Sequence, residues 1–296
     1  MKLTPGSTKI GFIGIGVMGK SVAGRLLDAG YAMCVHNRTR HKAQGLIERG
    51  AVWKDSPGAV AGECNVIFTM VGFPSDVEKV YFGGQGIIGC LRRGSYVIDL
   101  TTSSPDIAVR IHEAAGAKGA LALDAPVSGG DVGAREGRLS IMVGGDREAF
   151  EAVLPLFQLM GTNIVFQGGP GSGQHTKMCN QIAIAANMLG VCEAIAYAEK
   201  AGLDIQSVLK SIGGGAAASW SLSNLAPRII RRDFAPGFFV KHFIKDMTIA
   251  AQAARAMGLA TPGLDLAKSR YEQLARQGGA DDGTQALYKL YLQARP

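Results

Sequence analysis

The sequence predicts an α/β domain built on a mostly parallel sheet, followed by an all-helical domain. Short apolar runs alternate with helix-like segments from Lys9 to Phe166, as in a chain of βαβ units. This strand signal stops after a glycine-rich stretch at residues 168–173, and long helical patterns fill the rest. A chain of 296 residues can bury two cores, so we expect domains at residues 1–170 and 171–296.

The predicted strands are the short apolar runs of the first domain. They are Ile10–Ile13, Ala32–Val35, Val66–Met70, Val97–Leu100, Leu121–Leu123, Ile141–Val143 and Ile164–Phe166. The first four are bounded at their carboxyl ends by Gly, Asn, Asp or Thr, the residues that turn a chain or bind a ligand. Because an open parallel sheet binds ligands at the carboxyl ends of its strands, we expect the site at that edge.

The second domain is predicted to be helical throughout. Helices are expected over Gln174–Ala201, Asp204–Ile212, Phe239–Met257 and Pro262–Gln277, with Gly202 ending the first. That first helix is apolar on most of its circumference, so we expect burial on several sides and a homodimer or homotetramer formed through this domain. The segment 213–220 is either a flexible connector or a loop beside the site.

Composition narrows the class of protein. Hydrophobic residues make up 47% and charged residues 19%, a globular balance. The five cysteines are scattered and lack metal-ligand spacing, which favours a reduced cytoplasmic location and no metal. The polar N-terminus lacks a signal core, and the longest apolar run, at 182–191, is too short to span a membrane. The net charge of +7 favours anionic partners, but no basic stripe with aromatics indicates nucleic acid.

A glycine-rich motif between a predicted strand and a predicted helix indicates a dinucleotide site. Gly14, Ile15, Gly16, Val17, Met18 and Gly19 match G-x-G-x-x-G, and a helix-like run at 17–29 follows. Glycines let the backbone approach a pyrophosphate, whose charge the helix N-terminus stabilises. The alternative is an incidental turn, which the flanking strand and helix disfavour. The motif therefore predicts a Rossmann-type domain.

The end of the second predicted strand bears on the choice of cofactor. Asn37, Arg38 and Thr39 stand where an NAD-selective domain usually places an acid for the ribose hydroxyls. Arg38 can pair with a 2′-phosphate, so NADP(H) is favoured over NAD(H). A solvated basic turn is the alternative interpretation.

Two further motifs carry candidate chemistry. Ser128 sets a hydroxyl beside Gly129 and Gly130, which suits a carboxylate but also an ordinary turn. Lys177 opens an apolar helix with Asn180 and Gln181 in the next turn, where desolvation would lower its pKa toward that of a general acid. A solvated helical lysine is the competing interpretation. By residue type alone, the adjacent Lys245 and Asp246 are a surface charge pair.

Together these motifs resemble the β-hydroxyacid dehydrogenase family, which includes 3-hydroxyisobutyrate dehydrogenase, tartronate semialdehyde reductase, and glyoxylate and succinic semialdehyde reductases. The resemblance covers nearly the whole chain. Its landmarks are Gly11–Gly19, Asp124–Gly130, Gly168–Asn180 with Lys177, and Phe238–Asp246.

The resemblance implies roles for particular residues. Lys177 would be the catalytic acid and base, and Asn180 would orient the substrate. Ser128, Gly129 and Gly130 would bind the substrate carboxylate, and Phe238 and Asp246 would line its pocket. Some members carry Asn where this chain has Gln181, so that position also belongs to the expected substrate site. Cofactor contacts are expected from Met70, Val71, Gly72, Phe73, Thr102 and Lys245.

The expected reaction is hydride transfer between a nicotinamide and a small carboxylate-bearing 3-hydroxy acid or semialdehyde. Asn180–Gln181 is similar to tartronate semialdehyde reductase, whereas Asn37–Thr39 is similar to the NADPH-using glyoxylate and succinic semialdehyde reductases, so only the substrate class is expected. The alternatives are a catalytically silent NADP-binding scaffold module and an imine-reductase-like enzyme, although imine reductases generally lack the lysine at position 177. 6-Phosphogluconate dehydrogenase fits poorly, since it has a larger helical domain and His where Asn180 stands.

Overall fold

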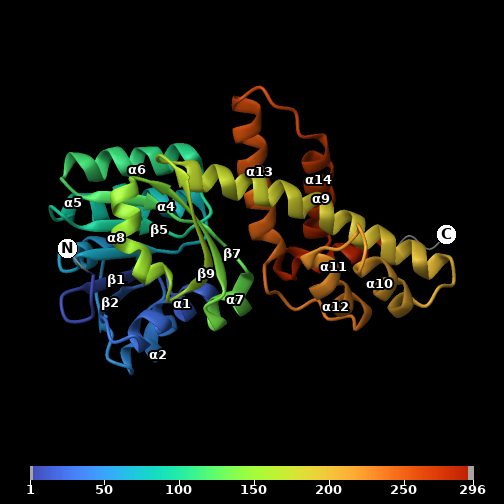
Figure 1. Cartoon of the computed structure of the whole chain (residues 1–296), viewed down its shortest axis with the longest axis horizontal. Coiled ribbons are helices and arrows are strands. Elements are labelled where there is room, and N and C mark those ends of the chain that lie inside the picture. The colour runs from blue at the N-terminus through green and yellow to red at the C-terminus, as the bar shows by residue number, and fades with distance from the viewer. Residues whose placement is uncertain (1–2, 293–296) are drawn as a thin grey trace. The chain divides into compact units, whose positions relative to one another are not determined.

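The computed structural model describes residues 3–292 and divides into two compact units, Met1–Lys177 and Met178–Pro296. The first is an α/β unit and the second is helical (Figure 1), which confirms the predicted fold class. Helix α9 (Ser172–Lys200) begins in the first unit and continues into the second.

The α/β unit is built on a single sheet that is mostly parallel. The strands, in their spatial order, are β3 (Val52–Trp53), β2 (Ala32–His36), β1 (Lys9–Ile13), β4 (Val66–Thr69), β5 (Tyr96–Asp99), β6 (Leu121–Asp124), β8 (Leu139–Gly145) and β7 (Val127–Ser128), with β9 (Gly161–Gly168) paired to β8. Strands β3 to β6 are parallel, whereas β8 is antiparallel to both β6 and β7. Every strand predicted from the sequence is present.

The register of the parallel strands brings their carboxyl ends to one edge. Ile13 pairs with Thr69, Thr69 with Asp99, and Asp99 with Asp124. These four residues end β1, β4, β5 and β6. The loops that follow the strands therefore begin side by side, as is expected from the sequence for a ligand site.

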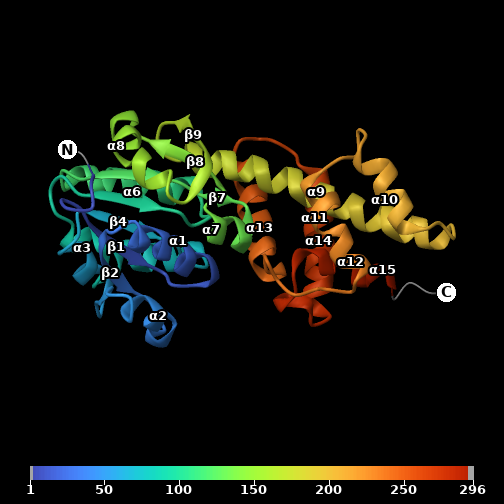
Figure 2. The same cartoon turned by 60° about the horizontal axis from the view of Figure 1, so that its bottom comes forward.

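Helices cover both faces of this sheet (Figures 1 and 2). One apolar layer packs α1 (Val17–Asp28) and α8 (Arg147–Phe157) against strand residues such as Phe12 and Phe68. The other packs α3 (Pro57–Ala61), α4 (Pro74–Phe82), α5 (Ile87–Cys90) and α6 (Pro105–Ala117) against residues such as Ile67 and Val97. The remaining helices are η1 (Arg40–Ala43), α2 (Gln44–Ile47) and α7 (Gly130–Glu136). Burial on both faces explains why the strands are continuously apolar.

The second unit packs its helices around a core of its own. After α9 come α10 (Ile205–Gly213), α11 (Trp220–Asn224), α12 (Ala226–Ile230), α13 (Val240–Ala256), α14 (Pro262–Arg276), η2 (Gly279–Asp281), η3 (Thr284–Tyr288) and α15 (Lys289–Leu292). Phe243 of α13 packs edge-on against Tyr271 of α14, with ring centroids 5.0 Å apart. The Tyr271 hydroxyl donates to the Thr284 carbonyl at 2.9 Å, which satisfies this buried polar group.

Helix α9 is buried on one side within this unit rather than on several. By length and composition alone it could cross a membrane, but core helices pass the same test, and α9 buries Ala185, Met188 and Cys192 in the core. The opposite stripe, which includes Ala183, Ala186, Gly190 and Tyr197, is exposed. Within the single chain, the predicted burial of α9 on several sides is therefore not found.

Candidate active site

The glycine-rich loop after β1 is tightly packed. Gly14 has φ +101°, and its N–H donates to the His36 carbonyl at 3.0 Å. A Cβ at Gly14 would overlap the Met70 carbonyl oxygen, and a Cβ at Gly19 would overlap the Gly14 carbonyl oxygen. Any larger residue at either position would force the loop away from α1 and β4.

The start of α1 fits the pyrophosphate of a dinucleotide. Gly16 caps the helix without a side-chain hydrogen bond, and the first turn carries no acidic residue. The N–H groups of that turn are therefore available to an anion. A Cβ built at Gly16 would meet nothing within 4 Å, so the backbone there is open to a ligand. Of the other predicted motif residues, Ile15 is buried, Val17 is exposed and Met18 is partly buried.

Of the residues after β2, Asn37 is hydrogen-bonded within the fold, whereas Arg38 is exposed. Asn37 Oδ1 accepts from the Ile15 N–H at 3.0 Å, and its Nδ2 donates to the Thr39 carbonyl at 2.8 Å. Asn37 thus holds the glycine-rich loop against its own turn. The Arg38 side chain is 88% exposed, and its Nη1 lies 3.5 Å from Asp76 Oδ1. This guanidinium can turn to a phosphate at little energetic cost.

The loops after β4 and β5 are joined by a chain of hydrogen bonds. The Val71 N–H donates to Thr101 Oγ1 at 3.0 Å, and the Thr101 N–H donates to Asp99 Oδ1 at 3.0 Å. Burial raises the pKa of Asp99 to about 6, against the opposing effect of its hydrogen bonds from Thr101 and Thr69. The other predicted cofactor residues on these two loops are Met70, Gly72, Phe73 and Thr102.

Lys177 is buried beside the predicted carboxylate-binding turn. Its side chain reaches across to β7, where Nζ donates to the Val127 carbonyl at 2.8 Å. Ser128 follows directly, and then Gly129 at φ +127° and Gly130 at φ +64°. Successive glycines of positive φ can turn their N–H groups toward one anion. The Lys177 ammonium is therefore bonded to the residue that directly precedes a serine and two glycines of positive φ.

Two residues that fix the start of α9 were not predicted from the sequence as site residues. Asp124 accepts from the N–H groups of Gly171 and Gln174 at 2.9 and 2.8 Å, and burial raises its pKa. Gln174 is fully buried and bonds to the backbone of Thr101 and Ser103. A polar residue in a helical pattern does not indicate which distant loop it contacts, so this pairing could not be predicted from the sequence.

In the second unit, the predicted site residues form one polar chain. Asn180 Nδ2 donates to Gln181 Oε1 at 2.6 Å, and Gln181 Nε2 donates to Asp246 Oδ2 at 2.6 Å. Lys245 Nζ lies 2.7 Å from Asp246 Oδ1, and the two side chains are only 12% and 3% exposed. The surface charge pair suggested by residue type alone is therefore wrong. A carboxylate only accepts, so Gln181 must turn its amide nitrogen to Asp246 and its amide oxygen to Asn180. Asn180 must then donate from its own amide nitrogen, which sets the orientation of the Asn180 amide.

Phe238 and His242 lie near this polar chain in the sequence. Phe238 precedes α13, and its ring centroid is 5.4 Å from that of Phe243. His242 was not singled out from the sequence. Burial lowers the pKa of His242, and the positive charge of Lys245 lowers it further. A neutral imidazole is therefore favoured there.

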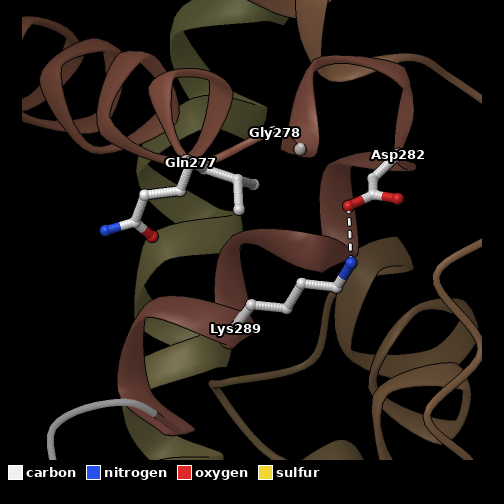
Figure 3. A pocket seen from close by; sticks show the side chains of 6 residues that line it. Gln277, Gly278, Asp282 and Lys289 are labelled. Carbon is white, nitrogen blue, oxygen red and sulfur yellow. Dashed lines mark hydrogen bonds and ion pairs between the residues drawn. The ribbon is translucent and has the colours of Figure 1, made fainter.

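The second unit also has a small hollow that contains none of the predicted site residues (Figure 3). It has a volume of about 160 Å³, and the Lys289 ammonium pairs with Asp282 at 2.6 Å on its wall. Its lining residues are Leu274, Gln277, Gly278, Gly279, Asp282 and Lys289. Within residues 3–292, no three His, Cys, Asp or Glu side chains come together as a metal site.

Comparisons with known proteins find matches over nearly the whole chain. Residues 9–169 match the NAD-binding domain of 6-phosphogluconate dehydrogenase, and residues 171–291 match the NAD-binding domain of NADP-dependent 3-hydroxyisobutyrate dehydrogenase. The chain is 60% identical over 283 residues to an uncharacterized oxidoreductase of Bacillus subtilis, covering 96% of this chain and 98% of the relative. It is 40% identical over 279 residues to 2-hydroxy-3-oxopropionate reductase of Escherichia coli, covering 94% and 95%.

A solved structure shows the same architecture. The 3-hydroxyisobutyrate dehydrogenase of Mycobacterium tuberculosis, determined with L-serine, superposes with a TM-score of 0.89 at 31% identity, covering 97% of this chain and 99% of that one.

Proposed function

Because the chain belongs to the β-hydroxyacid dehydrogenase family of NAD(P)-dependent oxidoreductases, we propose that it acts on small carboxylate-bearing 3-hydroxy acids or semialdehydes, with Lys177 as general acid and base. One observation carries the proposal. The Lys177 ammonium is buried and bonded to the Val127 carbonyl, directly before the Ser128–Gly130 turn. A charged donor held beside an anion-binding turn suits a substrate that carries both a carboxylate and a reacting oxygen.

The proposed acid–base step belongs to Lys177. The nicotinamide cofactor, when bound, supplies or accepts the hydride. In the reductive direction, Lys177 donates a proton from its ammonium to the oxygen that becomes the hydroxyl, and in oxidation it takes that proton back. The Val127 carbonyl accepts a hydrogen bond from the ammonium, which fixes the position of the side chain.

The Ser128–Gly130 turn would hold the carboxylate of the substrate. The Ser128 hydroxyl and the N–H groups of Gly129 and Gly130 are neutral donors, so they bind an anion without competing with Lys177 for the proton. Held in this way, the carboxylate fixes the carbon that exchanges hydride, and such positioning can lower a barrier by several kcal/mol. In the second unit, Asn180 is proposed to orient the substrate, Gln181, Phe238 and Asp246 to shape its site, and Lys245 to bind the cofactor.

A substrate panel tests this function directly. The purified chain is assayed with NADP(H) and NAD(H) against 3-hydroxyisobutyrate, L-serine, 2-hydroxy-3-oxopropionate, succinic semialdehyde and glyoxylate, with the nicotinamide absorbance as readout. We expect turnover of at least one three- or four-carbon compound. Tight cofactor binding without turnover of any compound would instead favour a silent binding module. A cyclic imine is assayed as a sixth compound, and its reduction with the other five inert would favour an imine-reductase-like enzyme.

A preference for NADP(H) is proposed from Arg38. The exposed guanidinium, with only a 3.5 Å contact to Asp76, is free to pair with a 2′-phosphate. We expect Arg38→Ala to weaken NADPH binding by about tenfold or more, because a charge-assisted hydrogen bond is lost. NADH has no 2′-phosphate, so its binding should be unchanged. Arg110, an exposed arginine that pairs with Glu78, provides the matched control, Arg110→Ala. Equal losses for NADPH and NADH would contradict the assignment.

Assembly through the helical unit is proposed from its uncovered apolar surface. No residue of α10 is fully buried, and its Ile205, Leu209 and Ile212 are only partly buried against the core of the unit. Tyr197 and Trp220 are 75% and 65% exposed. A single chain seldom leaves such a surface to water, so we expect a homodimer or homotetramer.

Light scattering after size exclusion measures this assembly. The wild-type chain is expected to have the mass of a dimer or tetramer, and the double variant Tyr197→Glu/Trp220→Glu that of a smaller species. A monomeric wild-type chain would exclude assembly.

A cytoplasmic location is proposed on the cysteines. All five are free thiols, and Cys34, Cys64 and Cys192 are buried, so no disulfide cross-links the fold. A fold that needs no disulfide suits a reducing compartment. Fractionation of the native cells, with the chain recovered in the soluble cytoplasmic fraction, is the expected result.

A further inference from the structure

Gln174 has no role in the proposed chemistry, yet it is one of the most enclosed polar side chains in the first unit. It lies in the first turn of α9 with no exposed surface. Its Nε2 donates to the Thr101 carbonyl at 2.7 Å, and its Oε1 accepts from the Ser103 N–H at 2.9 Å. The two bonds bracket Thr102, a predicted cofactor contact. Gln174 therefore ties the helix that carries Lys177 to the loop after β5.

The orientation of this amide is fixed. A backbone carbonyl only accepts and a backbone N–H only donates, so the amide oxygen must face Ser103 and the amide nitrogen must face Thr101. If the amide were flipped, its nitrogen would face the Ser103 N–H and its oxygen would face the Thr101 carbonyl. Such pairs of like groups are costly in a buried site that water does not reach. The contact is thus a rigid bridge between two backbone segments far apart in sequence.

The bridge extends beyond the loop after β5. Thr101 accepts from the Val71 N–H through its Oγ1 at 3.0 Å, so the loop after β4 is held by the same residue. On the other side, Asp124 accepts from the Gly171 and Gln174 N–H groups. The first turn of α9 is therefore bonded to the ends of β5 and β6 at once.

Close packing keeps α9 from sliding along these anchors. A Cβ at Gly173 would overlap the Met142 carbonyl oxygen, and a Cβ at Gly144 would lie 2.6 Å from the Gly173 nitrogen. The helix start therefore sits directly on the sheet. One turn later, Lys177 reaches the Val127 carbonyl. A small shift of the first turn would move the ammonium by a similar amount.

We propose that Gln174 is a positioning residue that sets the Lys177 ammonium relative to the cofactor-binding loops after β4 and β5. It touches neither the reacting atoms nor the substrate, and it acts through Lys177. This inference rests on the proposed role of Lys177 as acid and base. Misplacement of a catalytic group by about 1 Å can cost about a hundredfold in rate, so removing the bridge is expected to slow the chemical step.

The first test compares Gln174→Ala with Gln285→Ala. Gln285 is also a buried glutamine whose Nε2 donates to backbone carbonyls, those of Asp233 and Ala235, and no catalytic role is assigned to it. Hydride transfer is followed in single turnovers with the panel compound that wild-type protein turns over fastest. We expect Gln174→Ala to slow this step by about 10- to 100-fold, and Gln285→Ala to lower the melting temperature with the step within about twofold of wild type. Equal slowing of both would overturn the proposal.

The second test uses Gln174→Glu, which restores the bridge in only one protonation state. A protonated glutamic acid can donate to the Thr101 carbonyl and accept from Ser103, whereas the carboxylate sets an oxygen against that carbonyl. Burial holds the pKa of such a group above its usual value. The rate relative to wild type should be near one at low pH and fall as pH rises through that pKa. A constant ratio across pH would overturn the proposal, even if Gln174→Ala does not fold.

The double variant Lys177→Ala/Gln174→Ala separates this inference from the proposed function. If Gln174 acts through Lys177, its removal slows the enzyme in the wild-type background and changes little once Lys177 is absent. Equal slowing in both backgrounds overturns the positioning role. Near-normal turnover of Lys177→Ala alone overturns the proposed function itself, whereas an inactive Lys177→Ala with a normal Gln174→Ala overturns only the role of Gln174.

Discussion

Replacing Lys177 by Ala is expected to lower turnover by about 10²- to 10⁴-fold, the range for loss of a general acid and base. The ammonium is a buried proton donor held by the Val127 carbonyl, and alanine has no group that can donate or accept a proton in its place. NADPH binding should stay within a few-fold of wild type, because the glycine-rich loop and α1 are untouched. Steady-state kinetics together with a fluorescence titration of NADPH measure the two effects separately.

The matched control is Lys200→Ala, at the exposed end of the same helix. Its turnover should equal that of wild type. Turnover of Lys177→Ala within tenfold of wild type would remove Lys177 from the acid–base role. Loss of both turnover and NADPH binding would show instead that Lys177 supports the fold or the cofactor site.

Replacing Gly14 by Ala is expected to lower the free energy of unfolding by about 3 kcal/mol or more, and to abolish NADPH binding. Two effects add at this position. The backbone has φ +101°, a conformation that a side chain strains, and the new Cβ would overlap the Met70 carbonyl oxygen. Relieving that overlap would move the loop that is proposed to hold the pyrophosphate. Urea unfolding and NADPH titration measure the outcome.

Gly16→Ala provides the comparison within the same loop. Gly16 has a negative φ, and a Cβ there meets nothing within 4 Å, so its unfolding free energy should change by less than about 1 kcal/mol. We nevertheless expect weaker NADPH binding, because the methyl group would point into the space proposed for the pyrophosphate. Normal NADPH binding by Gly16→Ala would contradict the placement of the cofactor at the start of α1.

Much of the fold could be predicted because its signals are local. The strand β1, the glycine-rich motif and α1 stand in sequence order, and each has its own periodicity or turn chemistry. The two-residue strands β3 and β7 escaped prediction, since such short segments carry no alternation of their own. The five-residue helices α11 and α12 were missed for a similar reason. Their existence depends on what packs against them.

The sequence could name candidate site residues, but it could not show which contacts each of them makes. Asn37 was singled out as a cofactor donor, and the structure shows its amide bonded to Ile15 and Thr39. These two hydrogen bonds depend on the fold of the glycine-rich loop, which residue type alone does not show. The burial of Lys245 and Asp246 is also absent from the sequence, because adjacent charged residues in a helix are ordinarily solvated.

The sequence by itself determined the two-part architecture, the glycine-rich loop and the identity of the candidate lysine, since each follows from periodicity or from residues close together in the chain. Only the tertiary structure decided that Asp124 and Gln174 join strand ends to the start of α9, and that Lys177 reaches Val127. These bonds link segments about fifty to seventy residues apart. The physical reason is that a hydrogen bond depends on distance and direction in space, and the register of the sheet sets both.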